Sequence, residues 1–265
     1  MIVDSHCHLD DSAFDDDRPQ VLERAKTAGV GLILTIGTGD GPPDLEPAVR
    51  LAQQHRHVFA TVGVHPYDAS KAEAATFDRL AELCSNEKVL ALGEIGLDFH
   101  YDNSPREIQR DVFIKQMEVA RQARKPIVIH TREAWPETLD LLEEHWRPSG
   151  LGGIMHCFSG DGEQARRSIG CGFMIAFGGM LTFKRSHQLR QTAARLPLDC
   201  LLLETDAPYL TPAPFRKIRR NEPCYVAETA RQLAEVRGLA TEDVARATTA
   251  NFRRLFDLPV PAGEV

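Results

Sequence analysis

Short apolar runs rich in β-branched and aromatic residues alternate with amphipathic helical segments along the chain, and this alternation constrains the fold most. Near-continuous apolar character is typical of strands buried on both faces, as in parallel sheets. Parallel neighbours need a crossover of a dozen or more residues, usually a helix. The strands are expected at eight runs: residues 2–5, 31–36, 58–64, 89–94, 126–130, 153–157, 173–177 and 200–204.

Eight strand–helix units predict an α/β fold of the (β/α)8 TIM-barrel type. A doubly wound open sheet is the competing architecture, but the number of units and the distribution of polar residues favour closure into a barrel. The length of 265 residues suits one barrel, and no repeat, linker or low-complexity tract indicates a second domain. We therefore expect a single domain over residues 1–265.

The helices have boundary signals of their own. Ser104-Pro-Arg-Glu107 is typical of a capping box with proline at the first helical position. Apolar residues then recur at roughly helical spacing as far as Arg124, which predicts a helix there. Thr241 opens the last helix with two acidic residues in its first turn, where the helix dipole favours them.

The composition narrows the classes of function. The chain has 31 lysines and arginines against 38 aspartates and glutamates, a net charge of −7, so nucleic-acid binding by bulk electrostatics is not expected. Any affinity for phosphate must come from a local cluster or from bound metal. The six cysteines form no Cys-x-x-Cys pair, which favours reduced, mostly buried thiols. No apolar run is long enough to span a membrane and no secretory signal pattern is present, so a cytoplasmic protein is expected.

Side chains able to bind metal stand at the carboxyl ends of the expected strands. In a barrel these ends converge on one face, where active sites are built. Residues far apart in the sequence would then be neighbours. The candidates are His6, His8, His65, Glu94, His130, His156 and Asp206.

His6 and His8 are separated by one residue. In an extended segment such residues point the same way, so both imidazoles can reach one ion, while Cys7 points to the opposite face and packs there. One or two histidines alone would more often be satisfied core or loop residues. Four histidines and two carboxylates at successive strand ends indicate a shared cation instead, because burying several uncompensated ionisable groups together is costly.

Glu94 lies at the end of the fourth expected strand, in the middle of the candidate set. A carboxylate has two oxygens and can bridge two cations about 3.5–4 Å apart. Glu94 is therefore the expected bridging ligand. Asp98, four residues later, fits either an acceptor that orients a ligand or a cap in the following loop.

Glu204-Thr-Asp206 follows the eighth strand. Alternation places both carboxylates towards the barrel mouth, and Leu201 and Leu203 towards the helices. Asp206 is placed to ligate a cation and to accept a proton from water, and Glu94, Glu204 and Asp206 are the expected catalytic carboxylates. Glu204 lies one layer deeper, where it either orients a ligand through a hydrogen bond or forms a plain buried salt bridge.

The sequence does not fit the motifs of other common catalytic sites. No Gly-x-Ser-x-Gly elbow marks a serine nucleophile, and no phosphate-binding loop of the Gly-x-x-x-x-Gly-Lys-Ser/Thr type occurs. Cys157 beside His156 is rejected as a Cys/His couple, because adjacent strand residues point to opposite faces.

At these residues the sequence resembles the TatD family of metal-dependent deoxyribonucleases, within the amidohydrolase-like barrel superfamily, over nearly the whole chain. Several blocks in the right order are far more specific than any one of them. The blocks are Asp4-Ser-His-Cys-His8, Gly63-Val-His-Pro66, Gly93-Glu-Ile-Gly-Leu-Asp98, Ile129-His-Thr-Arg-Glu133, Met155-His-Cys-Phe-Ser-Gly160 and Leu203-Glu-Thr-Asp-Ala-Pro-Tyr-Leu210.

The resemblance implies a deoxyribonuclease of the 3'–5' exonuclease type, with single-stranded DNA as substrate and two divalent cations (Mg, Mn or Zn) as cofactors. It suggests that His65 and Arg132 hold a substrate phosphate. A basic family element is altered here to Phe215-Arg-Lys, and Lys217, Arg219 and Arg220 beside it fit either a guide for the substrate backbone or a solvated loop. The implied metal ligands are His6, His8, Glu94, His130, His156 and Asp206.

We expect His6, His8, Glu94 and Asp206 to hold one cation, and Glu94, His130 and His156 to hold the second. Imidazole ligands favour zinc, manganese or iron over magnesium, whereas the family is usually described as magnesium-dependent. Two alternatives remain open: a hydrolase of small esters, amides or phosphoesters on the same scaffold, and a barrel that binds nucleic acid or protein without catalysis. A monomer is the default expectation.

Overall fold

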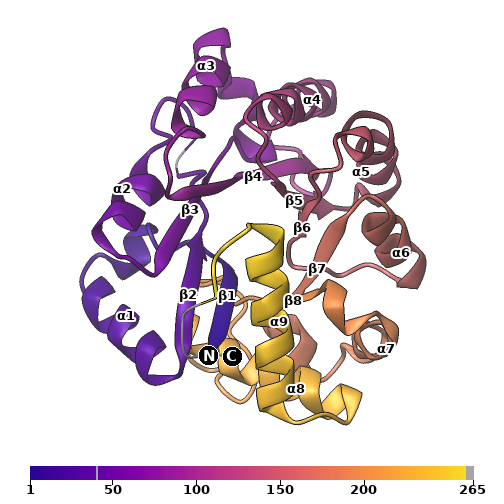
Figure 1. Ribbon diagram of the computed structural model, residues 1–265. Helices are drawn as coiled ribbons and strands as arrows, with labels where there is room; N and C mark the ends of the chain where they lie inside the picture. The colour runs from indigo at the N-terminus through magenta and orange to yellow at the C-terminus, as the bar shows by residue number, and fades with distance from the viewer. Residues whose placement is uncertain (40, 261–265) are drawn as a thin grey trace.

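The predicted strands form one parallel sheet that curves into a ring (Figure 1). Each strand is hydrogen-bonded to the next one along the chain. The strands are β1 (Ile2–Cys7), β2 (Val30–Thr35), β3 (Val58–Val62), β4 (Val89–Asp98), β5 (Ile127–Arg132), β6 (Gly153–Met155), β7 (Phe173–Phe177) and β8 (Leu201–Leu203). This computed structural model describes residues 1–39 and 41–260 and confirms the (β/α)8 barrel. Residues 261–265 of the expected domain lie outside the described residues.

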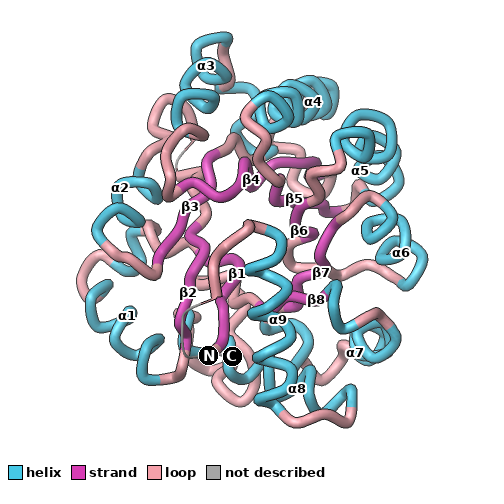
Figure 2. The backbone as a smooth tube through the Cα atoms, in the orientation of Figure 1, coloured by secondary structure: helices cyan, strands magenta, loops and turns pink. Residues whose placement is uncertain are grey.

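Helices join the consecutive strands around the ring, and the last helices follow β8, as Figure 2 shows by colour. They are α1 (Arg18–Thr27), α2 (Pro47–Gln54), α3 (Ala74–Leu83), α4 (Arg106–Gln122), α5 (Trp135–Leu141), α6 (Gly162–Gly170), α7 (His187–Arg195), α8 (Val226–Arg237) and α9 (Thr241–Leu255). Among residues 1–39 and 41–260, no helix combines the length and the apolar character needed to span a bilayer.

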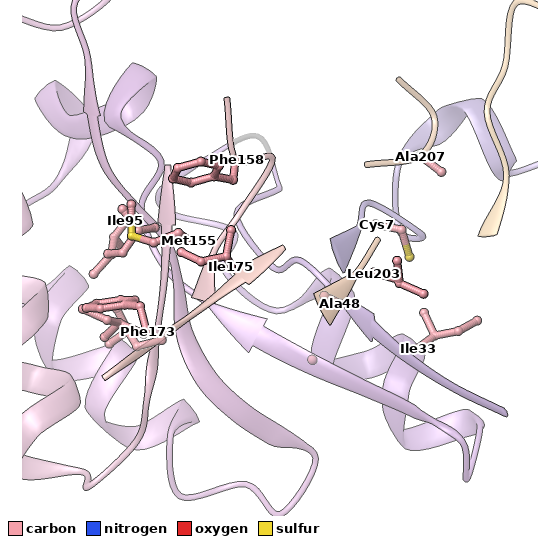
Figure 3. Packing of buried hydrophobic residues seen from close by; sticks show 14 of the residues in the cluster. Cys7, Ile33, Ala48, Ile95, Met155, Phe158, Phe173, Ile175, Leu203 and Ala207 are labelled. Atoms are coloured by element: carbon pink, nitrogen blue, oxygen red, sulfur yellow. The ribbon is translucent and has the colours of Figure 1, made fainter. Parts of the chain in front are cut away.

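Most buried apolar side chains lie between the ring and its helices. Met155 of β6 pairs with Ile175 of β7, and Figure 3 shows the two side chains together on this outer face. Cys7, Leu201 and Leu203 belong to the same cluster. The structure therefore confirms that these three side chains point away from the inside of the barrel.

A second cluster fills the inside of the ring. Val128 pairs with Ile154, and Ala176 pairs with Leu202, so these side chains line the inner face. Phe252 of α9 is fully buried among them. Since the same helix lies in front of the ring in Figure 1 and bonds to the chain start, α9 packs against the end of the barrel where the strands begin.

The seam between β1 and β8 is held differently from the other strand pairs. No ladder pair joins β1 to β8 in the described part of the chain. Instead, the N–H of Asp206 donates to the carbonyl of His6 at 2.9 Å, and the N–H of His8 donates to the carbonyl of Ala207 at 2.7 Å. The Asp4 carboxylate adds two bonds from Thr205, at 2.9 and 2.6 Å.

Most of the expected strand ends are wrong. β1 continues past Ser5 to Cys7 and β5 past His130 to Arg132, whereas β2 and β3 end one and two residues earlier than expected. β4 continues past Glu94 to Asp98, paired with β5 as far as Arg132. Gly96 makes this possible, because its φ is +142° and an added Cβ would lie 1.9 Å from the carbonyl oxygen of His130. β6 and β8 are shorter than expected, so Cys157 and Glu204 lie just beyond their strands.

The expected capping box at Ser104 is also wrong. α4 begins at Arg106, its N-cap is Pro105, and no side chain caps it. The Ser104 hydroxyl donates to the carbonyl of Tyr67 at 2.8 Å and accepts from the N–H of Ser70 at 3.0 Å. Because this hydroxyl ties two loops together, it is not available to the helix end. The acidic first turn of α9, which begins at Thr241, is confirmed.

Candidate metal centre

An extra residue in β1 directs the first two histidines into the barrel. Val3 lies in the interior cluster, so strict alternation would direct Cys7 inward as well. The register of β1 against β2 shifts between Asp4 and Cys7, which is a β-bulge. The bulge reverses the alternation, so Cys7 packs outside while His6 and His8 face the interior.

Glu94 is itself the extra residue of a second bulge. Its neighbours Gly93 and Ile95 pair with consecutive residues of β5, so Glu94 has no partner residue there. Leu92 and Ile95 both pack in the outer cluster, and Glu94 between them is directed inward. The carboxylate is almost completely buried.

The two oxygens of Glu94 face different imidazoles. Oε2 lies 3.5 Å from Nε2 of His6 and 3.9 Å from Nε2 of His8. Oε1 lies 2.8 Å from Nδ1 of His130 and 3.2 Å from Nε2 of His156. The carboxylate therefore lies between two sets of possible ligands, which is the geometry expected of a bridge between two cations.

Asp206 faces the first of these sets. Its Oδ1 lies 3.6 Å from Nε2 of His6 and 3.4 Å from Nε2 of His8. The ligand atoms of His6, His8 and Glu94 lie within 4.8 Å of one another, and so do those of His6, His156 and Asp206. Four side chains expected to hold the first cation are thus together at the mouth.

In the first set, around His6, His8 and Asp206, the separations fit a cation better than direct hydrogen bonds, whereas His130 is hydrogen-bonded to Glu94 at 2.8 Å. Two donor atoms about 2.1 Å from a tetrahedral ion lie about 3.4 Å from each other, close to the His6–Glu94 and His8–Asp206 distances. Both ring nitrogens of His6 are buried and have no hydrogen-bond partner among the described residues. A buried imidazole without a partner is costly, so these residues fit a bound divalent metal.

His65 also reaches the centre. Its Nε2 lies 3.6 Å from Oε1 of Glu94, and its ligand atom lies within 4.8 Å of those of Glu94 and His130. Its Nδ1 accepts the N–H of Tyr67 at 3.2 Å, so Nε2 is the nitrogen turned inward. A residue expected to hold substrate phosphate therefore also lies at ligand distance.

Arg132 lies farther out, at the end of β5. Its side chain is exposed, and its guanidinium lies 4.7 Å from the ring centroid of Tyr101. It has no ion-pair partner among the residues that the structure describes. This arginine is free to contact an anion at the rim.

Two buried carboxylates lie against imidazoles of the second set. Asp98 Oδ2 lies 2.9 Å from Nε2 of His130, and its Oδ1 accepts the N–H groups of His100 and Tyr101. Asp98 is therefore both an orienting acceptor and a loop cap. Glu204 Oε1 lies 3.4 Å from Nδ1 of His156. Such carboxylate–histidine pairs fix the orientation of an imidazole ligand and raise its basicity.

The surroundings of Glu94, Asp98 and Asp206 lower the pKa of each carboxyl and so favour its ionised form. Burial raises the pKa of Glu94, but the neighbouring His156 and hydrogen bonds from the imidazoles lower it by more, so it lies well below the usual range. Burial also raises the pKa of Asp98, but the hydrogen bond with His130 and two backbone N–H groups lower it by more, so this pKa falls to about 2. The pKa of Asp206 is lowered against burial by the bond with His8. Buried anions gathered with imidazoles are the donor set of a cation site.

Cys157 lies just beyond β6, beside His156. Its φ is +45°, outside the strand region, so strict strand alternation does not describe it. Its N–H donates to Oε1 of Glu204 at 2.6 Å. Burial raises the pKa of the Cys157 thiol well above its usual range, which favours the protonated thiol over the nucleophilic thiolate.

Asp4 and Thr205 were missing from the predicted site. The Asp4 carboxylate accepts both the N–H and the hydroxyl of Thr205, and lies 3.4 Å from the N–H of His6. It thereby ties the strand of His6 to the residue before Asp206. The sequence did offer one signal, an acidic residue within an apolar strand. Because a buried carboxylate needs partners, such a residue predicts polar groups close to it in the fold.

Imidazoles and carboxylates gathered at the carboxyl ends of eight parallel strands define a barrel of the metal-dependent hydrolase class. The family model described as "TatD related DNase" matches residues 3–257. The chain belongs to the TatD family.

Relatives of this chain include proteins from several bacteria. A protein of Bacillus subtilis called "Uncharacterized metal-dependent hydrolase YabD" is 40% identical, over 97% of this chain and 99% of its own length. The "3'-5' ssDNA/RNA exonuclease TatD" of Pectobacterium atrosepticum is 37% identical, over 97% and 100%. The crystal structure of YJJV, a TatD homologue of Escherichia coli, has a TM-score of 0.88 and 31% identity, over 97% of this chain and 98% of that one. The protein is therefore an enzyme, a metal-dependent hydrolase.

Proposed function

We propose that this hydrolase cleaves phosphodiester bonds of single-stranded DNA from the 3' end, with two divalent cations bridged by Glu94. The observation that supports it most directly is that the two oxygens of Glu94 face two separate sets of imidazoles. A further support is that a relative with 37% identity over its whole length is named as a 3'-5' exonuclease of single-stranded DNA and RNA.

In this proposal the donors act as two sets that share Glu94, with His156 between them, since its ligand atom also lies within 4.8 Å of those of His6 and Asp206. His6, His8 and Asp206 would hold one cation, and His130 and His156 would hold the other. Bound there, divalent cations supply Lewis-acid activation of water and neutralise charge on phosphate oxygens.

The protein's own groups would position the substrate and move the proton. Asp206 is ionised and lies at the mouth, so it can accept a proton from the attacking water. Nε2 of His65 is turned to the centre and the Arg132 guanidinium lies at the rim, so both can hold phosphate oxygens. Glu204 keeps His156 in position from below.

The test replaces Glu94 by Gln and, separately, Asp206 by Asn. Each change removes one anionic ligand but keeps the size of the side chain. We expect the metal content, measured by elemental analysis of purified protein, to fall. The rate at which a 5'-labelled single strand is shortened from its 3' end should fall by about 10²-fold or more. Glu235→Gln, an exposed carboxylate on α8, is the matched control.

The proposal fails if both variants retain the DNA hydrolysis of the wild type. It also fails if the metal-replete wild type cleaves small esters or lactones but no labelled strand, which would favour a small-molecule hydrolase on the same scaffold. Strands labelled at either end, offered as DNA and as RNA, determine polarity and sugar preference in the same assay.

A further inference from the structure

The positive charge of this acidic protein is concentrated in two segments. Residues 164–198 and 207–221 contain ten of the 31 lysines and arginines and none of the 38 aspartates and glutamates. These segments include the loops after β7 and after β8. The ten residues are Arg166, Arg167, Lys184, Arg185, Arg190, Arg195, Arg216, Lys217, Arg219 and Arg220.

Several of these cations have no acidic partner. Lys184, Arg185, Lys217 and Arg219 are exposed, and no ion pair holds any of them among the residues that the structure describes. Arg220 was expected to act together with Lys217 and Arg219. It differs from them because it is bound to Asp17 and Glu222. A lysine or arginine left unpaired is free to contact an anion.

Arg216 lies with the unpaired cations. Its guanidinium stacks at 3.9 Å over the ring of Phe183, and it contacts the carbonyl of Thr211 at 3.4 Å. Neither contact neutralises its charge. We call Lys184, Arg185, Arg216, Lys217 and Arg219 together the basic rim.

The two loops form one surface beside the metal centre. The N–H of Ala213 donates to the hydroxyl of Thr182 at 2.8 Å, and Arg216 of one loop covers Phe183 of the other. Gly178, at the start of the β7 loop, lies against the side chain of Glu204. Since both loops leave the carboxyl ends of their strands, the basic rim lies on the face of the barrel that contains the centre.

Two exposed tyrosines lie on either side of the centre. Tyr209 is 53% exposed and its ring lies 5.8 Å from that of His8. Tyr101 is also 53% exposed, follows β4, and has the Arg132 guanidinium over its ring. β4 and β8 are opposite each other in the ring of eight strands, so the two tyrosines flank the centre from opposite sides.

These features suit one kind of ligand. A cluster of unpaired cations on neighbouring loops attracts a phosphate backbone, and exposed aromatic rings stack on bases that are not paired in a duplex. Asp17, which is bound to Arg220 beside the basic rim, is also paired with Arg24, so its charge is already balanced.

We propose that the basic rim binds the phosphate backbone of a single-stranded nucleic acid, which crosses the mouth between Tyr101 and Tyr209. This inference rests on the proposed function, because it gives that reaction a path for its substrate. It also explains how a chain with a net charge of −7 can bind a polyanion, since the affinity comes from one local surface.

The experiment measures binding without turnover. The holoenzyme is titrated into a fluorescent oligothymidylate with phosphorothioate links, which keep the charge but resist hydrolysis, and anisotropy is followed at several salt concentrations. The test variant combines Lys184→Gln, Lys217→Gln and Arg219→Gln. The matched control combines Lys26→Gln, Arg56→Gln and Arg124→Gln, three exposed cations just before strands, at the opposite end of the barrel.

We expect the test variant to bind about tenfold more weakly at low salt, and its slope of log K against log salt to fall by about 2, since each phosphate contact contributes about 0.7 on a single strand. The control should bind as the wild type does. With cleavable substrates, the ratio of kcat/KM for an oligonucleotide to kcat/KM for bis(p-nitrophenyl) phosphate should fall in the test variant.

Three results would overturn the inference: an unchanged salt slope in the test variant, an equal loss in the control, or binding of duplex DNA or polyglutamate as tight as that of the single strand. A wild type that binds the strand through the basic rim without cleaving it would support the basic rim and refute the proposed nuclease. The two proposals therefore fail on different observations.

Discussion

At the scale of single residues, the centre depends on two β-bulges, in β1 and β4, that the sequence pattern does not predict. Leu92 and Ile95 share the outer face of β4 although three positions separate them, because Glu94 is added between their partners. Without the bulge, Glu94 would share the face of Leu92 and point at the helices. In the same way, without the bulge of β1, His6 and the following His8 would point at the helices. A register shift of one residue thus decides whether these side chains face the inside of the barrel or the apolar layer under the helices.

Replacing Asp4 tests whether its bonds across the β1–β8 seam are needed to hold the metal-binding side chains in position. Asp4→Asn keeps one acceptor oxygen for the N–H of Thr205, but it removes the second acceptor from the Thr205 hydroxyl. We expect a loss of about 10–100-fold in metal affinity, the usual effect of changing a group that orients ligands, with the fold retained. Competition with a chromogenic chelator measures that affinity.

Thr205→Ser is the control for this change, since serine keeps both the N–H and the hydroxyl. It should bind metal as the wild type does. If Asp4→Asn also binds metal with wild-type affinity, Asp4 serves only the packing of the seam.

At the scale of elements, α9 has a role that the alternation of strands and helices does not predict. It places Phe252 among the interior side chains at the end where the strands begin, and Asn251 donates to the carbonyls of Leu198 and Leu201. The helix therefore covers the inside of the barrel at the end opposite the metal centre.

Phe252→Ala should therefore reduce stability without affecting the centre. The ring is fully buried, and removing it should lower the free energy of unfolding by about 3–5 kcal/mol. Urea denaturation measures the loss, and elemental analysis should find the metal content of the wild type. Leu239→Ala, at an exposed site between α8 and α9, is the control, and a loss no larger than its own would contradict the role given to α9.

Element boundaries depended on contacts that lie far away in the sequence. The capping pattern at Ser104 is locally correct, yet the hydroxyl bonds to Tyr67 and Ser70 instead of the helix end. β4 extends past its expected end because β5 supplies a partner as far as Arg132. Local propensity predicts which element forms, whereas the tertiary partner decides where it stops.

At the scale of the whole molecule, the fold brings buried carboxylates and imidazoles together at the barrel mouth, where a bound cation would stabilise them. Ligands bound only by the folded state stabilise it, by about 2.7 kcal/mol at a concentration of 100 times Kd. Removing metal with a chelator should therefore lower the Tm of the wild type by several degrees, and added Zn²⁺ or Mn²⁺ should restore it. Differential scanning calorimetry measures both changes.

The Glu94→Gln variant is the matched comparison, since it lacks the proposed bridging anion. Its Tm should respond weakly to chelator and to added metal. A wild-type Tm that is the same with and without metal would contradict a cation site built into the folded state.

The sequence by itself determined the (β/α)8 architecture and the residues expected to gather at its mouth. Both follow from local patterns: apolar runs of strand length, helical periodicity, and polar groups such as His130 and Asp206 where runs end. Only the tertiary structure decided which way Glu94 points, that Asp4 closes the seam, and that Arg220 is paired while Lys217 is not. These features depend on register and on partners distant in the sequence, which no local pattern contains.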